Sequence, residues 1–280
     1  MGTELQRAGA GECYALWNLT HPQRVRAVHL AYVEAGAEML LTNTFQANPE
    51  ALAKHGAEDQ CEAVWRASVA IARAAAGPDR YVVADVGPMF DPRARDWTIG
   101  DLTAVEQMWS AMAGVDAVLL ETFSDPWSLL AADFCGTLPH HDRVPVLFSF
   151  TYARTQGGGL RTAGGHRPET LAREAGPHDI AALGVNCGRD ISMDDIIEVV
   201  RRYRTVTDLP LFARPNAGTP LRTGGRWVYP HIPDTMAKRL PELLEAGVCM
   251  VGGCCGTTPA HIAAFRPVVD HRNQSRRARD

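Results

Sequence analysis

Residues 248–265, VCMVGGCCGTTPAHIAAF, hold a short apolar run, a glycine-rich loop and a helical pattern that opens at Pro259. Proline suits the first turn of a helix, because the N–H that it lacks would have no partner there. A buried strand followed by a loop and a helix is the repeating unit of α/β proteins with parallel sheets. This part of the chain therefore predicts one such unit, with two adjacent cysteines after its strand.

The same alternation continues toward the amino terminus. Apolar runs predict strands at Glu38–Leu41, Tyr81–Val86, Ala117–Leu120, Val144–Phe150, Ile180–Val185, Pro210–Ala213 and Val248–Val251. Helical patterns cover His21–Ala35, Pro49–Ala76, Asp101–Ala113, Pro126–Leu138, Pro168–Ala175, Ser192–Tyr203, Ile232–Ala246 and Pro259–Phe265. Almost eight units in 280 residues, against the ~250 residues typical of the fold, favour a (β/α)8 TIM barrel over a doubly wound sheet.

The pattern contains seven strands, whereas the closed barrel has eight. No segment before His21 has the pattern of a strand, and Met1–Thr3 suits the loop that follows one. We therefore expect a TIM barrel that lacks its first strand in the given chain. No linker or repeat divides the sequence, so residues 1–270 are predicted to form one domain and the arginine-rich residues 271–280 a disordered polar tail.

The composition excludes several classes of function. The 28 basic and 32 acidic residues give a net charge of −4, which favours neither nucleic acid nor an anionic membrane as a partner. The apolar runs are much shorter than the roughly 20 residues of a membrane-spanning helix. The first residues carry no secretory signal, so we expect a cytoplasmic protein that acts on small molecules.

Three of the seven cysteines lie at the ends of predicted strands. Seven cysteines in a reducing compartment favour metal or catalytic use over disulfides. Cys187 ends one strand, and Cys254 and Cys255 follow the strand two places later. Because the carboxyl ends of barrel strands meet at one rim, the three sulfurs can converge, although an accidental or redox-labile Cys-Cys pair is the alternative. The other four are expected to be small buried side chains: Cys13, Cys61, Cys135 and Cys249.

Three converging thiolates suit zinc, and three protein ligands leave the fourth tetrahedral position open, as in catalytic sites. The flanking glycines, Gly252, Gly253 and Gly256, allow two adjacent cysteines to turn toward one ion. A zinc ion with three thiolates is a poor Lewis acid, so hydrolysis is disfavoured. It can instead hold a substrate thiol as thiolate, since a free thiol of pKa about 8.5 is mostly protonated at pH 7. We predict thiolate attack on a methyl donor.

Five motifs together resemble the homocysteine S-methyltransferase family, in the same order along nearly the whole chain. They are Thr42–Phe45, Leu120–Thr122, Gly184–Cys187, Pro215–Gly218 and Gly252–Pro259. The resemblance implies a single homocysteine-binding barrel over residues 1–270. It also implies that Cys187, Cys254 and Cys255 are zinc ligands, with the sulfur of homocysteine at the open position.

The resemblance further implies a set of residues around the substrate. Glu121 would bind the ammonium end of homocysteine, Asn186 would lie beside the metal, and the pocket would be lined by Thr44, Phe45 and the backbone near Gly2 and Thr3. By itself, Glu121 could equally cap a helix or pair with an arginine. Asn216 is expected to shape a tight turn, and Trp227 and Tyr229 are expected to pack in the core rather than contact a cationic methyl group.

One motif is incomplete. The family's first strand ends in Asp-Gly-x-Met-Gly-Thr, and this chain starts at Met1-Gly2-Thr3, so the aspartate that would contact homocysteine is absent. A start codon assigned too late would explain this, because a barrel without a strand exposes two unpaired edges, which natural proteins avoid. A truncated, inactive member of the family is the alternative.

The sequence therefore predicts a zinc-dependent methyltransferase. It would move a methyl group from a small donor, S-methylmethionine before others, to homocysteine and so form methionine. The expected partners are homocysteine and this donor, and the expected cofactor is Zn²⁺. The alternatives are another thiol acceptor, a corrinoid partner protein as the methyl source, and a non-catalytic relic that binds zinc or homocysteine.

Overall fold

Seven parallel strands form one curled sheet in the computed structural model, which describes residues 1–88, 107–137, 144–223 and 226–278. In sheet order they are β1 (Met39–Leu41), β2 (Tyr81–Val86), β3 (Ala117–Phe123), β4 (Val146–Phe150), β7 (Ala182–Asn186), β8 (Leu211–Arg214) and β11 (Val248–Val251). Two short antiparallel pairs lie outside the sheet: β5 (Ala153–Arg154) with β6 (Leu160–Arg161), and β9 (Leu221–Thr223) with β10 (Arg226–Val228). All seven predicted strands are confirmed, and β3 runs three residues longer than expected.

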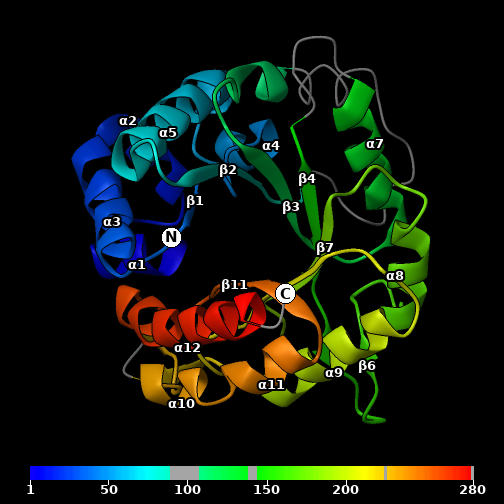
Figure 1. The fold of residues 1–280 in the computed structure, drawn as a ribbon. Helices are drawn as coiled ribbons and strands as arrows, with labels where there is room; N and C mark the ends of the chain where they lie inside the picture. Colours follow the sequence, from blue (N-terminus) through cyan, green and yellow to red (C-terminus); the bar gives the residue numbers. More distant parts are fainter. Residues whose placement is uncertain (89–106, 138–143, 224–225, 279–280) are drawn as a thin grey trace.

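Helices surround the sheet (Figure 1). They are α1 (Gly2–Arg7), α2 (Trp17–Thr20), α3 (Pro22–Glu34), α4 (Pro49–Ala53), α5 (Cys61–Ala76), α7 (Leu130–Thr137), α8 (Pro168–Ala175), α9 (Met193–Arg204), α10 (Pro233–Ala237), α11 (Leu240–Glu245) and α12 (Pro259–Arg277), with 3-10 turns η1 (Tyr14–Leu16), η2 (Glu58–Gln60) and η3 (Pro126–Leu129). None of the helices in the described part of the chain is long and apolar enough to cross a membrane.

Local chemistry explains where the helices differ from the prediction. The predicted helix Pro49–Ala76 is divided into α4 and α5, because Gly56 between them has a φ of +63°, outside the helical range. The predicted helix Ile232–Ala246 is divided into α10 and α11, because Pro241 cannot donate a helical hydrogen bond and so begins a new helix. The predicted helix Asp101–Ala113 starts outside the described residues.

The two ends of the chain also differ from the prediction. Residues 2–7 form α1, where the sequence analysis expects a loop. At the other end, α12 continues to Arg277, so residues 271–277 are helical and the prediction of a disordered tail from residue 271 is wrong for them. The polar residues Arg272, Asn273 and Arg276 of this helix line a cavity against the sheet, which gives the segment a tertiary partner that composition does not reveal.

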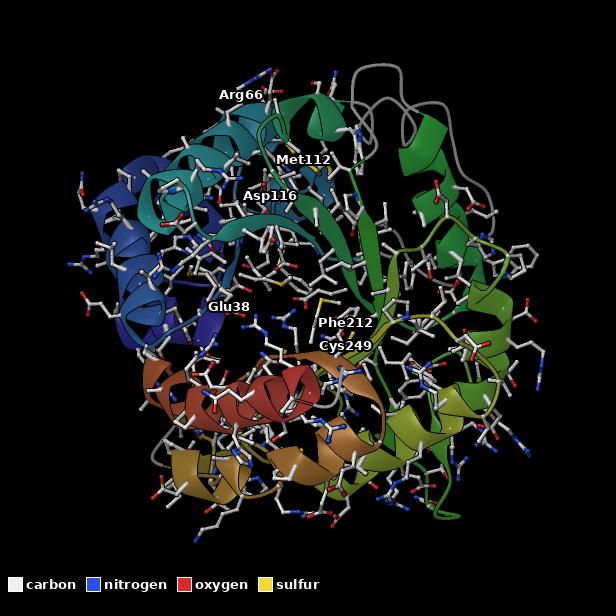
Figure 2. All side chains as sticks on the ribbon, in the orientation of Figure 1. Glu38, Arg66, Met112, Asp116, Phe212 and Cys249 are labelled. Atoms are coloured by element: carbon white, nitrogen blue, oxygen red, sulfur yellow. The ribbon has the colours of Figure 1, made fainter. Side chains whose placement is uncertain are left out.

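The inside of the curled sheet has two layers, because alternate residues of a strand point to the same face. The apolar layer consists of Val83, Leu119, Leu147 and Phe212, which pack in one cluster; Figure 2 shows Phe212 within the ring of strands. Gly184 of β7 makes room for Phe212, since a Cβ there would lie 2.3 Å from its ring. The polar layer lies two residues further along the same strands and consists of Asp85, Glu121, Ser149, Asn186 and Arg214.

The sheet does not close through strand pairing. β1 and β11 stand at opposite ends of the strand order, and no pairing between them occurs among the described residues. Side chains bridge this seam: Arg266 of α12 lies 2.7 Å from Glu38 just before β1, and the Tyr32 hydroxyl donates to the Thr257 carbonyl at 3.0 Å. A cavity of about 270 Å³ lies between the two edge strands. Over the described residues, the structure is a parallel barrel of seven strands that is open between β1 and β11, in agreement with the predicted fold.

Candidate metal centre

The sulfur atoms of Cys187, Cys254 and Cys255 converge at the carboxyl ends of β7 and β11. All three lie within 4.8 Å of one another, and Sγ of Cys187 is 3.9 Å from Sγ of Cys255. A tetrahedral zinc ion with Zn–S bonds of about 2.3 Å places its sulfur ligands about 3.8 Å apart. The donor atoms and their spacing therefore fit one zinc ion.

The loop after β8 holds the two cysteine loops together. The N–H of Cys254 donates to the Pro215 carbonyl at 2.9 Å, and the N–H of Cys255 donates to Oδ1 of Asn216 at 3.0 Å. Nδ2 of Asn216 also reaches the Gly188 carbonyl at 3.4 Å. Asn216 thus connects the loop of Cys187 with that of Cys255, a longer-range role than the local turn expected from its sequence.

Backbone strain and proton sharing distinguish Cys187. Its φ of +53° is a left-handed conformation, which side chains with a Cβ rarely adopt and which is typical of functional sites. Hydrogen bonds from the thiols of Cys254 and Cys255, with further ones from Gly188 and Asn216, lower the pKa of Cys187 to about 3. The pKa values of Cys254 and Cys255 are raised, because both thiols donate to or face that anion. The three thiols therefore share their protons as one coupled group.

Asn186 lies beside this centre in a fully satisfied position. Its Nδ2 donates to Oγ1 of Thr122 at 2.8 Å and lies 3.9 Å from Sγ of Cys254. Its Oδ1 accepts from Oγ of Ser149 at 2.6 Å and from the N–H of Thr122 at 3.2 Å. These bonds orient the amide so that its N–H faces sulfur. Asn186 therefore lies beside the cluster of sulfur atoms, and its place beside a bound metal stays a prediction.

Glu121 has an arginine partner. Its carboxylate accepts a hydrogen bond from Nη1 of Arg214, and both side chains are mostly buried. It also shares a side-chain hydrogen bond with Asp85. Burial raises the pKa of Asp85, with the charge of Glu121 adding to the effect and Arg214 opposing it. The sequence analysis missed Asp85 and Arg214; the signal was a charged residue at an inward position of an apolar strand end.

The four other candidate residues, Thr44, Phe45, Gly2 and Thr3, make separate contacts around the site and do not gather at one point. The hydroxyl of Thr44 donates to the Asp85 carbonyl at 2.7 Å, and Phe45 packs against the backbone of Gly87. Oγ1 of Thr3 accepts from the N–H of Gly256 at 3.3 Å, which fastens α1 to the cysteine loop. Gly2 faces the Tyr14 ring, where a Cβ would lie 2.7 Å from a ring carbon.

The predicted burial of the remaining cysteines and of Trp227 and Tyr229 is confirmed for some of them and wrong for others. Cys13 and Cys61 are half-buried against the core, whereas Cys249 is exposed, contrary to the prediction, because it belongs to the edge strand β11. The side chain of Cys135 lies outside the described part of the structure. The prediction that Trp227 packs in the core is wrong, because its side chain is 64% exposed. Tyr229 packs partly against the core beside Cys255 and Gly256.

Known proteins resemble this chain along nearly its whole length. The sequence pattern described as homocysteine S-methyltransferase matches residues 1–269. Methionine synthase from Mycobacterium tuberculosis is 31% identical over 94% of this chain, and methionine synthase from Mycobacterium leprae is 30% identical over 98% of it. These matches cover 23% and 24% of the two relatives, so the chain spans about a quarter of their length.

Solved structures show the same similarity in three dimensions. The metallated form of the homocysteine methyltransferase MmuM from Escherichia coli superposes with a TM-score of 0.74 and 28% identity, over 96% of this chain and 93% of that one. A methyltransferase from Methanosarcina mazei shares the fold, with a TM-score of 0.58 and 14% identity over 96% of this chain and 90% of the other. Because the family pattern covers nearly every residue, this chain belongs to the homocysteine S-methyltransferase family.

Proposed function

We propose that the chain transfers a methyl group from S-methylmethionine to the sulfur of homocysteine, with zinc held by Cys187, Cys254 and Cys255. The observation that carries this proposal is the spacing of the three sulfur atoms, within 4.8 Å of one another, at the carboxyl rim of the barrel. Such a centre needs reduced thiols, so a cytoplasmic location is part of the proposal.

The residues of the chain prepare a site for a thiol. Zinc bound to the three cysteines would supply an open position at which the acceptor thiol stays deprotonated at neutral pH. Asn186 directs an N–H toward Cys254, and Asn216 keeps Cys255 in position. Glu121 is proposed to bind the ammonium end of homocysteine, and Thr44, Phe45 and the backbone at Gly2 and Thr3 to border the pocket.

The transfer balances in charge as well as in atoms. The thiol loses its proton to solvent, and a sulfur electron pair forms a bond to the methyl carbon of the donor. The bond from that carbon to the sulfonium sulfur breaks, and its electron pair neutralises the sulfonium, so two molecules of methionine result. An anion and a cation become two uncharged sulfur groups, a change that a site poor in water favours. This charge balance supports a sulfonium donor.

Metal content and methyl transfer test the proposal in three proteins: the unchanged chain, Cys254→Ser and Cys249→Ser. Cys249 is a matched control, because it lies on β11 close in sequence to the centre but is exposed and outside the sulfur cluster. We expect about one zinc per chain and methionine formation in the unchanged chain and in Cys249→Ser, and the loss of both in Cys254→Ser.

Two results would contradict parts of the proposal. Freshly reduced protein that binds no zinc would overturn the metal centre. Zinc without methyl transfer from S-methylmethionine would overturn the donor, and the same assay with S-adenosylmethionine, betaine or a methylated corrinoid then identifies a different one. A second thiol offered in place of homocysteine tests the acceptor in the same way.

A further inference from the structure

The side chain of Tyr229 reaches the sulfur cluster from the segment that follows β10. Its ring lies directly on the backbone of Gly256, where a Cβ would be 2.1 Å from Cγ of the ring. Its hydroxyl shares a side-chain hydrogen bond with Cys255, and burial together with the charge of Cys255 raises the pKa of Tyr229. The hydroxyl therefore keeps its proton. Because a thiolate can only accept, a deprotonated Cys255 receives this hydrogen bond from Tyr229.

The backbone fixes Tyr229 in this position. The N–H of His231 donates to the Ala217 carbonyl at 2.9 Å, and the His231 carbonyl accepts from Nε2 of His261 at 2.9 Å. The N–H of Ala217 in turn donates to the Cys255 carbonyl at 2.9 Å. The segment that carries Tyr229 is thus tied to the loop that carries Cys255, so the hydroxyl is held against the sulfur.

The other two sulfur atoms of the cluster also have donors. Nδ2 of Asn186 lies 3.9 Å from Sγ of Cys254. The N–H of Gly188 and the side chain of Asn216 form hydrogen bonds with Cys187. Stability alone does not require these donors, because a cysteine sulfur is a weak acceptor that can be buried like a small apolar group. Every cysteine of the cluster nevertheless has its own donor, from a different part of the chain.

Hydrogen bonds of this kind lower the reactivity of a thiolate toward a methyl donor. The thiolate is the nucleophilic form of cysteine, and sulfur loses its negative charge as the bond to carbon forms. A hydrogen-bond donor therefore stabilises the thiolate more than the transition state, which raises the barrier. A centre that brings an acceptor thiolate beside three cysteine thiolates needs such a difference, because a methyl group transferred to a cysteine would remove a metal ligand.

We propose that the Tyr229 hydroxyl protects Cys255 from methylation by the donor, and that the two asparagines protect the other two cysteines. The acceptor sulfur then remains the nucleophile that takes the methyl group. Tyr229 acts through Cys255 and is therefore a positioning residue, a role different from core packing and from contact with a cationic methyl group. The inference rests on the proposed function for the metal centre, and it adds how that centre selects among its sulfur atoms.

Methyl iodide tests the protection on the zinc-bound protein in the absence of homocysteine. An electron pair of the cysteine sulfur bonds to the methyl carbon, and iodide leaves with the electrons of the broken bond. Peptide mass spectrometry measures methylation at Cys255, with the exposed Cys249 of the same sample as the internal reference. Relative to Cys249, we expect Tyr229→Phe to be methylated at Cys255 at least about fivefold faster than the unchanged protein, since a hydrogen bond to a charged group is lost.

Tyr32→Phe is the matched control. The Tyr32 hydroxyl donates to the Thr257 carbonyl at 3.0 Å, so it fastens the same loop through a carbonyl rather than through sulfur. This variant should leave the methylation of Cys255 unchanged. Tyr229→Phe keeps the ring that packs on Gly256, so its zinc content should equal that of the unchanged protein.

Asn186→Ala tests the same protection at a second sulfur atom. In zinc-saturated protein it should speed the methylation of Cys254 and leave that of Cys255 unchanged, because each donor faces one sulfur. Equal acceleration at both cysteines would mean that the variant loosens the whole centre, and would contradict protection by individual donors.

The outcomes separate this inference from the proposed function. If zinc is bound but Cys255 of Tyr229→Phe is methylated no faster than in the unchanged protein, the protection is wrong, even where methyl transfer to homocysteine proceeds. If the expected difference is found but S-methylmethionine and homocysteine give no methionine, the protection stands and the proposed transfer is wrong. A chain that binds no zinc overturns both.

Discussion

The apolar and polar layers of the barrel interior belong to the same strands and differ by two residues in each. Val83 and Asp85 follow one another on the inner face of β2, as do Phe212 and Arg214 on β8. The apolar layer stabilises the fold through burial. The polar layer buries charges whose desolvation offsets much of their attraction, so it contributes little to stability. The residues at the carboxyl ends of the strands thus contribute less to the stability of the fold than the apolar layer does, and they supply the polar groups of the site.

The backbone shows the same contrast. Gly184 lies level with the apolar layer, where it admits the ring of Phe212 without strain. At the end of the strands, Thr122 and Cys187 have φ values of +69° and +53°, a left-handed conformation that costs non-glycine residues roughly 1–3 kcal/mol. Among the described residues, Asp190 is the third non-glycine residue with a positive φ, whereas Thr122 contacts Asn186 and Cys187 contacts the other cysteines.

The largest effect is expected in the apolar layer. Phe212→Ala should lower the free energy of unfolding by about 3–5 kcal/mol, because it removes a buried ring and leaves a cavity above Gly184. Urea denaturation measures the loss, and zinc content per folded chain should not change. A loss below about 1 kcal/mol would show that the apolar layer does not support the barrel as the contrast requires.

The polar layer should respond differently to the loss of a single side chain. Arg214→Gln is expected to cost about 3 kcal/mol of unfolding free energy, since it leaves Glu121 buried without a partner. Adding Glu121→Gln should restore most of that stability. A double-mutant cycle by urea denaturation measures the coupling. Strictly additive losses would contradict the buried ion pair.

A smaller effect is expected where the polar layer meets the metal centre. Asn186→Ala should weaken zinc binding about 10–100-fold, because the amide that faces Cys254 is a neighbour of a proposed ligand. Competition with a chelator measures the affinity. Thr20→Ala serves as the control, because it removes an exposed hydroxyl on α2, far from Asn186 in the sequence. Equal affinity in Asn186→Ala and the control would remove Asn186 from the centre.

The smallest effect concerns a buried side chain outside both layers. Burial, with a smaller contribution from the amino terminus, lowers the pKa of His29 from 6.5 to about 3, and its Nε2 has no partner among the described residues. Below pH 6.5 the unfolded chain takes up a proton that the folded chain refuses, so stability falls as pH falls toward 3.

This linkage predicts a loss of about 1.4 kcal/mol at pH 5.5 relative to pH 7.5, from His29 alone. His29→Gln should flatten the pH dependence of unfolding by that amount, as measured by denaturation at the two pH values. An unchanged pH dependence would mean that His29 has the same pKa in the folded and the unfolded chain, and so that burial does not disfavour its charged form.

The sequence by itself determined the strands, their direction and the three cysteines. Alternating apolar runs and proline-initiated helices are local patterns, so Tyr81–Val86, Pro168–Ala175 and Val248–Val251 have the predicted bounds. Because parallel strands end at one rim, the positions of Cys187 and Cys254 after their strands were enough to predict that their sulfurs meet. The same count of strands predicted the gap between β1 and β11.

Only the tertiary structure decided which charges meet. Glu121 and Arg214 are 93 residues apart, and their strands β3 and β8 are not neighbours in the sheet, so they touch because the sheet curls until its inner faces oppose. The contact of residues 271–277 with the seam likewise depends on where α12 lies. Local patterns encode which face a side chain takes, whereas the partner across a barrel depends on the curvature and register of every strand between.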